Sequence, residues 1–171
     1  MCQNVFPAVL QDIVFINMIK TIFSNKRKML AKFDLNKSLE ELENCNWREP
    51  TYDSHLVVTC HKLRKVPLKL FSIEDLRIMI GQNVGLKFLV PLALKHLHSH
   101  PLAQGDFYPG DLLISLLRVE TSFYSQNPDY CKEIHQIVQT VLLMGQKKKK
   151  RFSDSIEIVR EAYQLFSQNF P

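Results

Sequence analysis

The stretch Gly85-Leu-Lys-Phe-Leu-Val-Pro-Leu-Ala-Leu-Lys-His-Leu97 has apolar side chains on both sides of the helix that its spacing predicts. On one side of this helix, apolar residues recur at intervals of three and four positions. The other side is also apolar, because it holds Phe88, Pro91 and Leu92. A helix that is apolar all round is normally buried between other helices. We therefore expect an all-α fold, a compact multi-helix bundle around a buried central helix at about 86–98. The run Leu112-Leu-Ile-Ser-Leu-Leu117 predicts a second buried helix.

Local signals place further helices around this centre. Ser38 with Glu41, and Ser72 with Asp75, have the spacing of capping boxes, which predicts a helix start at each serine. Asn127-Pro128-Asp129 predicts another start, because it supplies a cap, a proline at the first helical position and an early acid. No stretch has the pattern of a strand of useful length.

Prolines and glycines are expected to set several boundaries. Pro91 should kink the central helix or move its start towards Val90, because proline lacks a backbone N–H. Pro109 is predicted in the first turn of the following helix, and Gly145 is predicted to end the helix that begins at Asn127.

The side-chain pattern predicts which faces of the outer helices are buried. A helix from about 54 to 65 should bury Leu56, Cys60 and Leu63 and expose Lys62, Arg64 and Lys65. A last helix at about 154–168 should bury Ile156, Val159, Tyr163 and Phe166. Residues 6–30 are predicted to form an amphipathic helix rather than a signal peptide, because the basic residues follow the apolar part.

Charge is unevenly distributed along the 171 residues, although the net charge is +5. Residues 1–37 and 144–171 are basic, whereas residues 38–143 hold ten basic and twelve acidic side chains. A mildly acidic centre suits a basic partner. Four cysteines without paired spacing (Cys2, Cys45, Cys60 and Cys131) are expected to be reduced, which fits a cytoplasmic protein.

Motifs of catalysis and metal binding are missing from the sequence. No nucleophile elbow, phosphate-binding loop or zinc-protease motif occurs, so we expect no enzyme activity and no cofactor. His96 with His100, and Cys131 with His135, have the spacing of metal ligands on a helix. We nevertheless expect no metal, because the first pair lies at a polar helix end.

Several segments in order resemble one family: Ser38-Leu-Glu-Glu-Leu-Glu43, Trp47, Leu63-Arg-Lys-Val-Pro-Leu68, Glu74-Asp-Leu-Arg-Ile-Met-Ile-Gly-Gln82, Leu89-Val-Pro-Leu-Ala-Leu94 and Pro101-Leu-Ala-Gln-Gly-Asp-Phe-Tyr-Pro-Gly-Asp-Leu-Leu113. This series is similar to the all-helical immunity proteins of bacterial contact-dependent growth inhibition (CDI), the CdiI family. The resemblance covers roughly residues 37–140.

The resemblance implies a function in binding. Such a protein would bind and neutralise the cognate CdiA C-terminal toxin domain, often a nuclease that acts on RNA or tRNA. It also implies a division into an N-terminal helical extension (1–36), an immunity-protein core (37–143), and a basic linker with a C-terminal amphipathic helix (144–171). No membrane partner is expected.

An alternative function rests on the basic run Lys147–Arg151 and a sequence pI of about 9.0. These features would suit a helical regulator with a basic tail that binds nucleic acid. No aromatic stacking residues are interleaved with the run, so a solvated linker explains it as well. Nucleic acid is otherwise not expected as a partner.

Toxin-binding residues are predicted where acids and aromatics occur together outside the cores of helices, because aromatics anchor interfaces and carboxylates steer basic partners. The alternative is structural: Trp47 would plug the core, and residues 106–111 would form a loop whose amides bond to a carboxylate. The predicted contacts are Trp47, Glu49, Tyr52, Asp53, Asp106, Tyr108 and Asp111.

Overall fold

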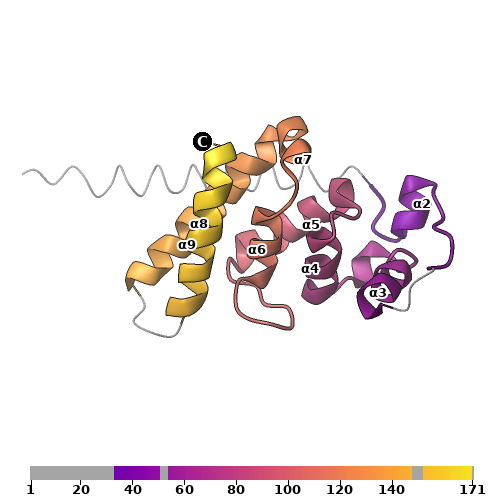
Figure 1. The fold of residues 1–171 in the computed structure, drawn as a ribbon, viewed down its shortest axis with the longest axis horizontal. Coiled ribbons are helices and arrows are strands. Elements are labelled where there is room, and N and C mark those ends of the chain that lie inside the picture. The colour runs from indigo at the N-terminus through magenta and orange to yellow at the C-terminus, as the bar shows by residue number, and fades with distance from the viewer. Residues whose placement is uncertain (1–32, 51–53, 148–151, 171) are drawn as a thin grey trace, which may run out of the picture. The chain divides into compact units, whose positions relative to one another are not determined.

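The computed structural model describes residues 33–50, 54–147 and 152–170, and these residues are helical without a strand (Figure 1). The all-α expectation is confirmed. Leu35–Pro171 form one compact unit. The helix expected at 6–30 lies outside the described residues. The helices are α2 (Leu39–Glu43), α3 (His55–Leu63), α4 (Ile73–Gly81), α5 (Leu86–Ser99), α6 (Asp111–Leu117), α7 (Thr121–Gln126), α8 (Pro128–Lys147) and α9 (Ser153–Asn169), with a 3₁₀ turn at Leu68–Leu70.

The central helix is α5, which packs against α4, α6 and α8. Its side chains are buried on both sides, from Leu89 and Val90 to Phe88 and Leu92. The helix begins at Leu86, so of the two alternatives expected for Pro91 the later start towards Val90 does not occur. Pro91 lies inside the helix, where burial of the ring among apolar neighbours offsets the missing hydrogen bond to the Lys87 carbonyl.

Both predicted capping boxes are present. The Ser38 hydroxyl accepts the Glu41 N–H and the Glu41 carboxylate accepts the Ser38 N–H, at 3.3 and 2.7 Å. The corresponding distances for Ser72 and Asp75 are 3.1 and 2.8 Å. These reciprocal bonds satisfy amides that the first turn of each helix leaves without a partner.

The structure corrects the predicted faces of α3. Arg64 is only 1% exposed rather than outward-facing, and Leu56 is 39% exposed rather than buried. Arg64 keeps helical φ and ψ of −58° and −24°, and its N–H bonds to the Cys60 carbonyl at 3.1 Å. Residues four apart share a helix face, so Arg64 lies on the same buried side as Cys60. Leu56 lies in the first turn of α3, close to the helix end, where fewer neighbours cover it.

Two helix boundaries differ from the prediction, and the structure contains one helix that the sequence did not predict. Pro109 precedes α6, because Gly110, with φ of 95°, is the residue before the first helical position. Gly145 lies inside α8 and does not end it. A Cβ atom at Gly145 would lie 3.2 Å from Ile156, so the glycine permits close packing of α9. The short helix α7 has no counterpart among the predicted elements.

The last helix, α9, packs against α6 and α8. Ile156, Val159 and Phe166 are buried as expected. Tyr163 is only half-buried, and its hydroxyl contacts Nδ1 of His135 at 2.8 Å, which places it at the border of the core. None of the helices in the described ranges is long and apolar enough to span a membrane.

Candidate functional site

The connection between α5 and α6 is a loop held by a buried carboxylate. Asp111, the first residue of α6, is 4% exposed and accepts the N–H groups of Gly105 and Phe107 at 2.7 and 3.2 Å. The Gly110 N–H also bonds to the Ala103 carbonyl at 3.2 Å. A negative charge in the first helical turn is favourable, because the helix dipole is positive there. Asp111 therefore fixes the shape of the loop.

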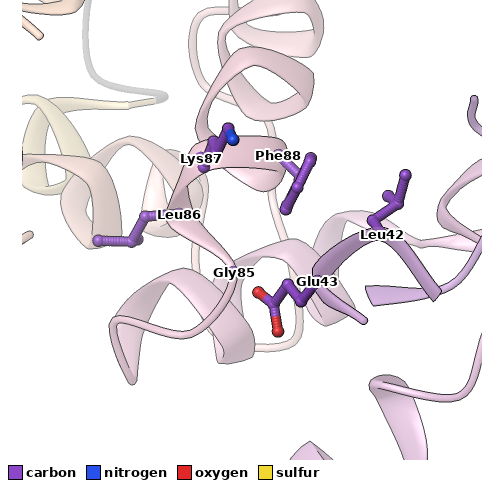
Figure 2. A pocket seen from close by; sticks show the side chains of 6 residues that line it. All are labelled: Leu42, Glu43, Gly85, Leu86, Lys87 and Phe88. Atoms are coloured by element: carbon purple, nitrogen blue, oxygen red, sulfur yellow. The ribbon is translucent and has the colours of Figure 1, made fainter. Parts of the chain in front are cut away.

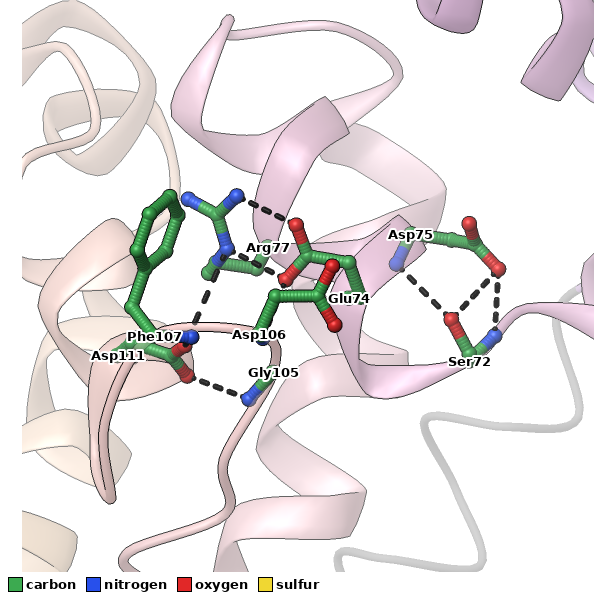
Figure 3. A network of polar contacts seen from close by, with 8 residues as sticks. All are labelled: Ser72, Glu74, Asp75, Arg77, Gly105, Asp106, Phe107 and Asp111. Carbon is green, nitrogen blue, oxygen red and sulfur yellow. Dashed lines mark hydrogen bonds and ion pairs between the residues drawn. The ribbon is translucent and has the colours of Figure 1, made fainter.

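A second carboxylate, that of Glu74 on α4, also bonds to this loop (Figure 3). Glu74 accepts two hydrogen bonds from Arg77, at 2.7 Å from Nε and 2.6 Å from Nη2, and it also accepts the Asp106 N–H at 2.9 Å. Arg77 Nε lies 4.0 Å from the Asp111 carboxylate. Such a bidentate pair is geometrically specific. It joins α4, the loop and the start of α6 into one polar network.

The network shifts the pKa values of its two central groups in opposite directions. The hydrogen bond from Arg77 lowers the pKa of Glu74, opposed by partial burial and helped by the Asp106 amide. The same hydrogen bond raises the pKa of Arg77. Both shifts favour the charged forms, so the pair stays ionised at neutral pH.

Glu74→Gln should therefore destabilise the protein in a pH-dependent way, by about 1–2 kcal/mol near neutral pH. A carboxyl with a lowered pKa in the folded state contributes stability above its ordinary pKa of 4.5, and this contribution disappears as pH falls through the lowered pKa. Urea denaturation of both proteins between pH 7 and pH 3 measures the difference. A difference that stays constant over this range would contradict an ionic role for Glu74.

Gly105 makes this arrangement possible. A Cβ atom there would overlap Oε2 of Glu74 and lie 3.1 Å from Oδ2 of Asp111. Because the Glu74 carboxylate is fixed by Arg77, it could not move aside without losing hydrogen bonds. Glycine therefore permits the loop backbone to approach both carboxylates.

The loop carries three of the predicted toxin-binding residues, with different exposure. Asp106 is exposed, Tyr108 is half-buried, and Asp111 is buried with its oxygens occupied by loop amides. Phe107, between the first two, is 66% exposed. The loop thus displays one carboxylate and one aromatic ring outward.

A second segment with predicted toxin-binding residues follows α2, and Arg64 makes the contacts that hold it in place. The Arg64 guanidinium donates to Glu43 at 2.6 Å and to the Cys45 carbonyl at 2.8 Å. Trp47 covers it, with 4.2 Å from Cζ to the ring centroid, and also contacts His61 edge-on at 5.0 Å. Trp47 is 36% exposed, and its ring shields the buried Arg64 guanidinium from solvent.

The remaining predicted residues lie near this segment in sequence. Glu49 is 88% exposed and 3.5 Å from Lys65, whereas Tyr52 and Asp53 lie outside the described residues. Figure 1 shows the segment after α2 and the loop between α5 and α6 in separate regions, on either side of α4. The structure therefore does not join Trp47 and Glu49 with Asp106 and Tyr108 in a single cluster.

An open hollow lies between α2 and the start of α5 (Figure 2). Glu43 lines it, but this carboxylate already bonds to Arg64. Gly85, which also lines it, has φ of 64°, and a Cβ atom there would lie 2.8 Å from Leu39. The hollow offers a ligand no buried polar group that lacks a partner, and we assign it no function. Its lining is Leu42, Glu43, Gly85, Leu86, Lys87 and Phe88.

The residues with metal-ligand spacing have other surroundings. His135 contacts the Tyr163 hydroxyl, and burial raises the pKa of the Cys131 thiol, which disfavours the thiolate that a metal needs. Burial lowers the pKa of His96, helped by Lys95. Within the described ranges no group of three potential ligands converges. The described cysteines, Cys45, Cys60 and Cys131, are free thiols.

A family model described as CDI immunity proteins matches residues 41–134, which is more than half of the chain. The matched segment contains α3 to α7, the start of α8, the Arg64 cluster and the whole polar network of Glu74, Arg77 and Asp111. The chain therefore belongs to the CDI immunity proteins, as its sequence resemblance implied. No curated protein and no solved structure matches it.

Glu74, Arg77 and Phe107 are not among the predicted site residues, although they form the polar network and its exposed ring. Arg64 is predicted from the sequence to face solvent, although the structure buries it. The pair Glu74 and Arg77 has the i, i+3 spacing of an ion pair, which was the available signal. Its contact with a loop 32 residues away has no local sequence signal.

Proposed function

We propose that this protein binds the C-terminal toxin domain of its cognate CDI effector, CdiA, and neutralises it by occlusion. The match of residues 41–134 to the CDI immunity proteins carries this proposal, because members of such a family are expected to bind a cognate toxin. In this proposal the protein acts in the cytoplasm, without a cofactor or catalytic activity of its own.

The direct test is co-expression in a susceptible cell with the C-terminal domain of the effector encoded next to this chain. We expect growth to be restored by this chain and not by an unrelated immunity protein. Failure to bind that domain in a purified mixture would contradict the proposal.

We propose further that the toxin is a nuclease that acts on RNA or tRNA. Such enzymes use lysines and arginines to hold phosphates, and the acidic excess of residues 38–143 complements a basic surface. Residues 37–143 would supply the toxin-binding core. The basic run Lys147–Arg151, beyond that core, lies mostly outside the described residues.

The proposed contact surface centres on the loop between α5 and α6, where the Asp106 side chain is exposed. Asp111 would act there by holding the loop rather than by contact, and Tyr108 would lie at the border. Glu49, with Tyr52 and Asp53, would form a second contact region, and Trp47 would support it from its position over Arg64.

Asp106→Lys should weaken toxin binding, mainly by slowing association, because an exposed carboxylate steers a basic partner. We expect a fall of roughly tenfold in the association rate at low salt, and a smaller effect at high salt, where charges are screened. Stopped-flow mixing with the purified toxin domain measures this rate.

Glu120→Lys is the matched control, because Glu120 is also exposed but follows the other end of α6. Equal effects of the two variants would mean that net charge, rather than the loop, governs association. The melting temperature of the Asp106 variant should fall only slightly, since the substitution keeps the backbone N–H that bonds to Glu74 and the exposed side chain acts on Arg77 only by its charge.

A further inference from the structure

We propose that Phe107 is the anchor residue of the toxin interface, and that its ring fills an apolar pocket of the toxin bordered by basic side chains. Arg77 would be the residue that positions the ring. This inference rests on the proposed function and adds the residue that carries most of the affinity.

The first observation is the exposure of the ring. Phe107 is 66% exposed, whereas Trp47, the other large aromatic among the exposed residues described, is 36% exposed and covers Arg64. Single exposed apolar residues are common on protein surfaces and do not by themselves mark a site. The surroundings of Phe107 separate it from an ordinary exposed side chain.

One face of the ring is already occupied. The Arg77 guanidinium lies over it, with 4.4 Å from Cζ to the ring centroid, and Figure 3 shows the two side chains next to each other. Arg77 is itself fixed by two hydrogen bonds to Glu74. The contact therefore limits the orientations of the ring while much of its surface stays available to a partner.

The backbone under the ring is also fixed. The Phe107 N–H bonds to Asp111, and its neighbours Gly105 and Asp106 bond to Asp111 and Glu74. Binding by a segment that is already held in place loses less conformational entropy than binding by a free loop. A rigid, exposed aromatic ring on such a loop has the properties of an interface anchor.

The charges around Phe107 indicate the chemistry of the partner. The Arg77 guanidinium lies 2.6 Å from the Glu74 carboxylate and 4.0 Å from that of Asp111, and the charge of Asp106 also acts on it, which leaves an acidic excess. Nucleic acid would be repelled, and a second copy would bring two acidic loops together. A basic protein surface with an apolar pocket fits both the charge and the ring, and a toxin that binds phosphates would supply the basic side chains.

The test is the affinity of the purified chain for the C-terminal domain of the effector encoded next to it. Phe107→Ala should weaken binding about 30-fold or more, the range of interface hot spots. Leu165→Ala is the matched control, because Leu165 is equally exposed at 66% but lies on α9. We expect at most a twofold change in affinity for the control, and melting temperatures lower by no more than a few degrees for both variants.

Arg77 is tested through a double-mutant cycle, because a merely structural role would act independently of the ring. Arg77→Lys should weaken binding about threefold to fivefold when Phe107 is present, as expected for a lost ring contact. The same change should have no further effect in the Phe107→Ala background. Equal losses in both backgrounds would overturn the positioning role.

The outcomes separate this inference from the proposed function. If the wild-type chain does not bind the toxin domain, the proposed function fails and the inference fails with it. If the wild type binds and Phe107→Ala binds equally well, only the anchor is overturned. A wild-type dimer in sedimentation that Phe107→Ala converts to a monomer would assign the ring to a second copy instead.

Discussion

Replacing Phe166 by alanine should lower the free energy of unfolding by about 3–5 kcal/mol, the usual cost of deleting a buried aromatic ring. Phe166 is 4% exposed and contacts the rings of Tyr124, His135 and Phe170 at 5.1–5.5 Å between centroids. The cavity would open where α9 meets the rest of the bundle. Thermal unfolding should show a melting temperature lower by about 6–20 °C.

Leu165→Ala is the control for this variant, because the adjacent side chain is 66% exposed. Its effect should stay within about 0.5 kcal/mol. Similar losses for the two variants would show that α9 does not pack through Phe166. Toxin affinity measured well below the melting temperature should be unchanged, because α9 lies beyond the matched residues 41–134.

The second large effect is expected at Arg64. Arg64→Met should reduce the free energy of unfolding by about 2–4 kcal/mol, because it removes two hydrogen bonds and leaves Glu43 without its ion-pair partner. The loss is limited because Glu43 is 27% exposed and can be hydrated again. Arg64 Nε is buried without a partner among the described atoms, and its removal also offsets part of the loss.

Lys65→Met provides the comparison at the next residue. Lys65 is 55% exposed and pairs with Glu49 at 3.5 Å, an arrangement that contributes less than about 1 kcal/mol. Urea denaturation of both variants measures the contrast. Fluorescence of Trp47, the single tryptophan of the chain, should change in the folded Arg64 variant, because the ring loses its cationic neighbour. Equal stabilities would contradict the buried role of Arg64.

Helix starts and buried helix faces could be predicted from the sequence, because the residues that indicate them are close together in the chain. The capping boxes at Ser38 and Ser72 need only residues three positions apart, and the apolar surface of α5 repeats within four. The predicted helices of the described residues therefore match the structure in type. The family followed from the ordered segments of residues 37–140, and the matched range 41–134 confirms it.

Helix boundaries were less predictable, because a glycine or a proline is compatible with more than one position relative to a helix end. Gly145 could end a helix or admit a neighbour, and only the position of Ile156 shows that it admits α9. Pro109 could begin a helix or precede it, and the left-handed φ of Gly110 decides for the second. Neither choice is determined by residues that are close in sequence.

The amino-acid sequence by itself determined the helical class, the buried centre and the family of this protein. Tertiary structure alone decided the roles of the polar residues: it buried Arg64 under Trp47 and bonded Glu74 to Asp106 across 32 residues. It also left Phe107 exposed over Arg77. The physical reason is range, because helix periodicity and capping act over a few residues, whereas a polar network depends on which distant segments meet.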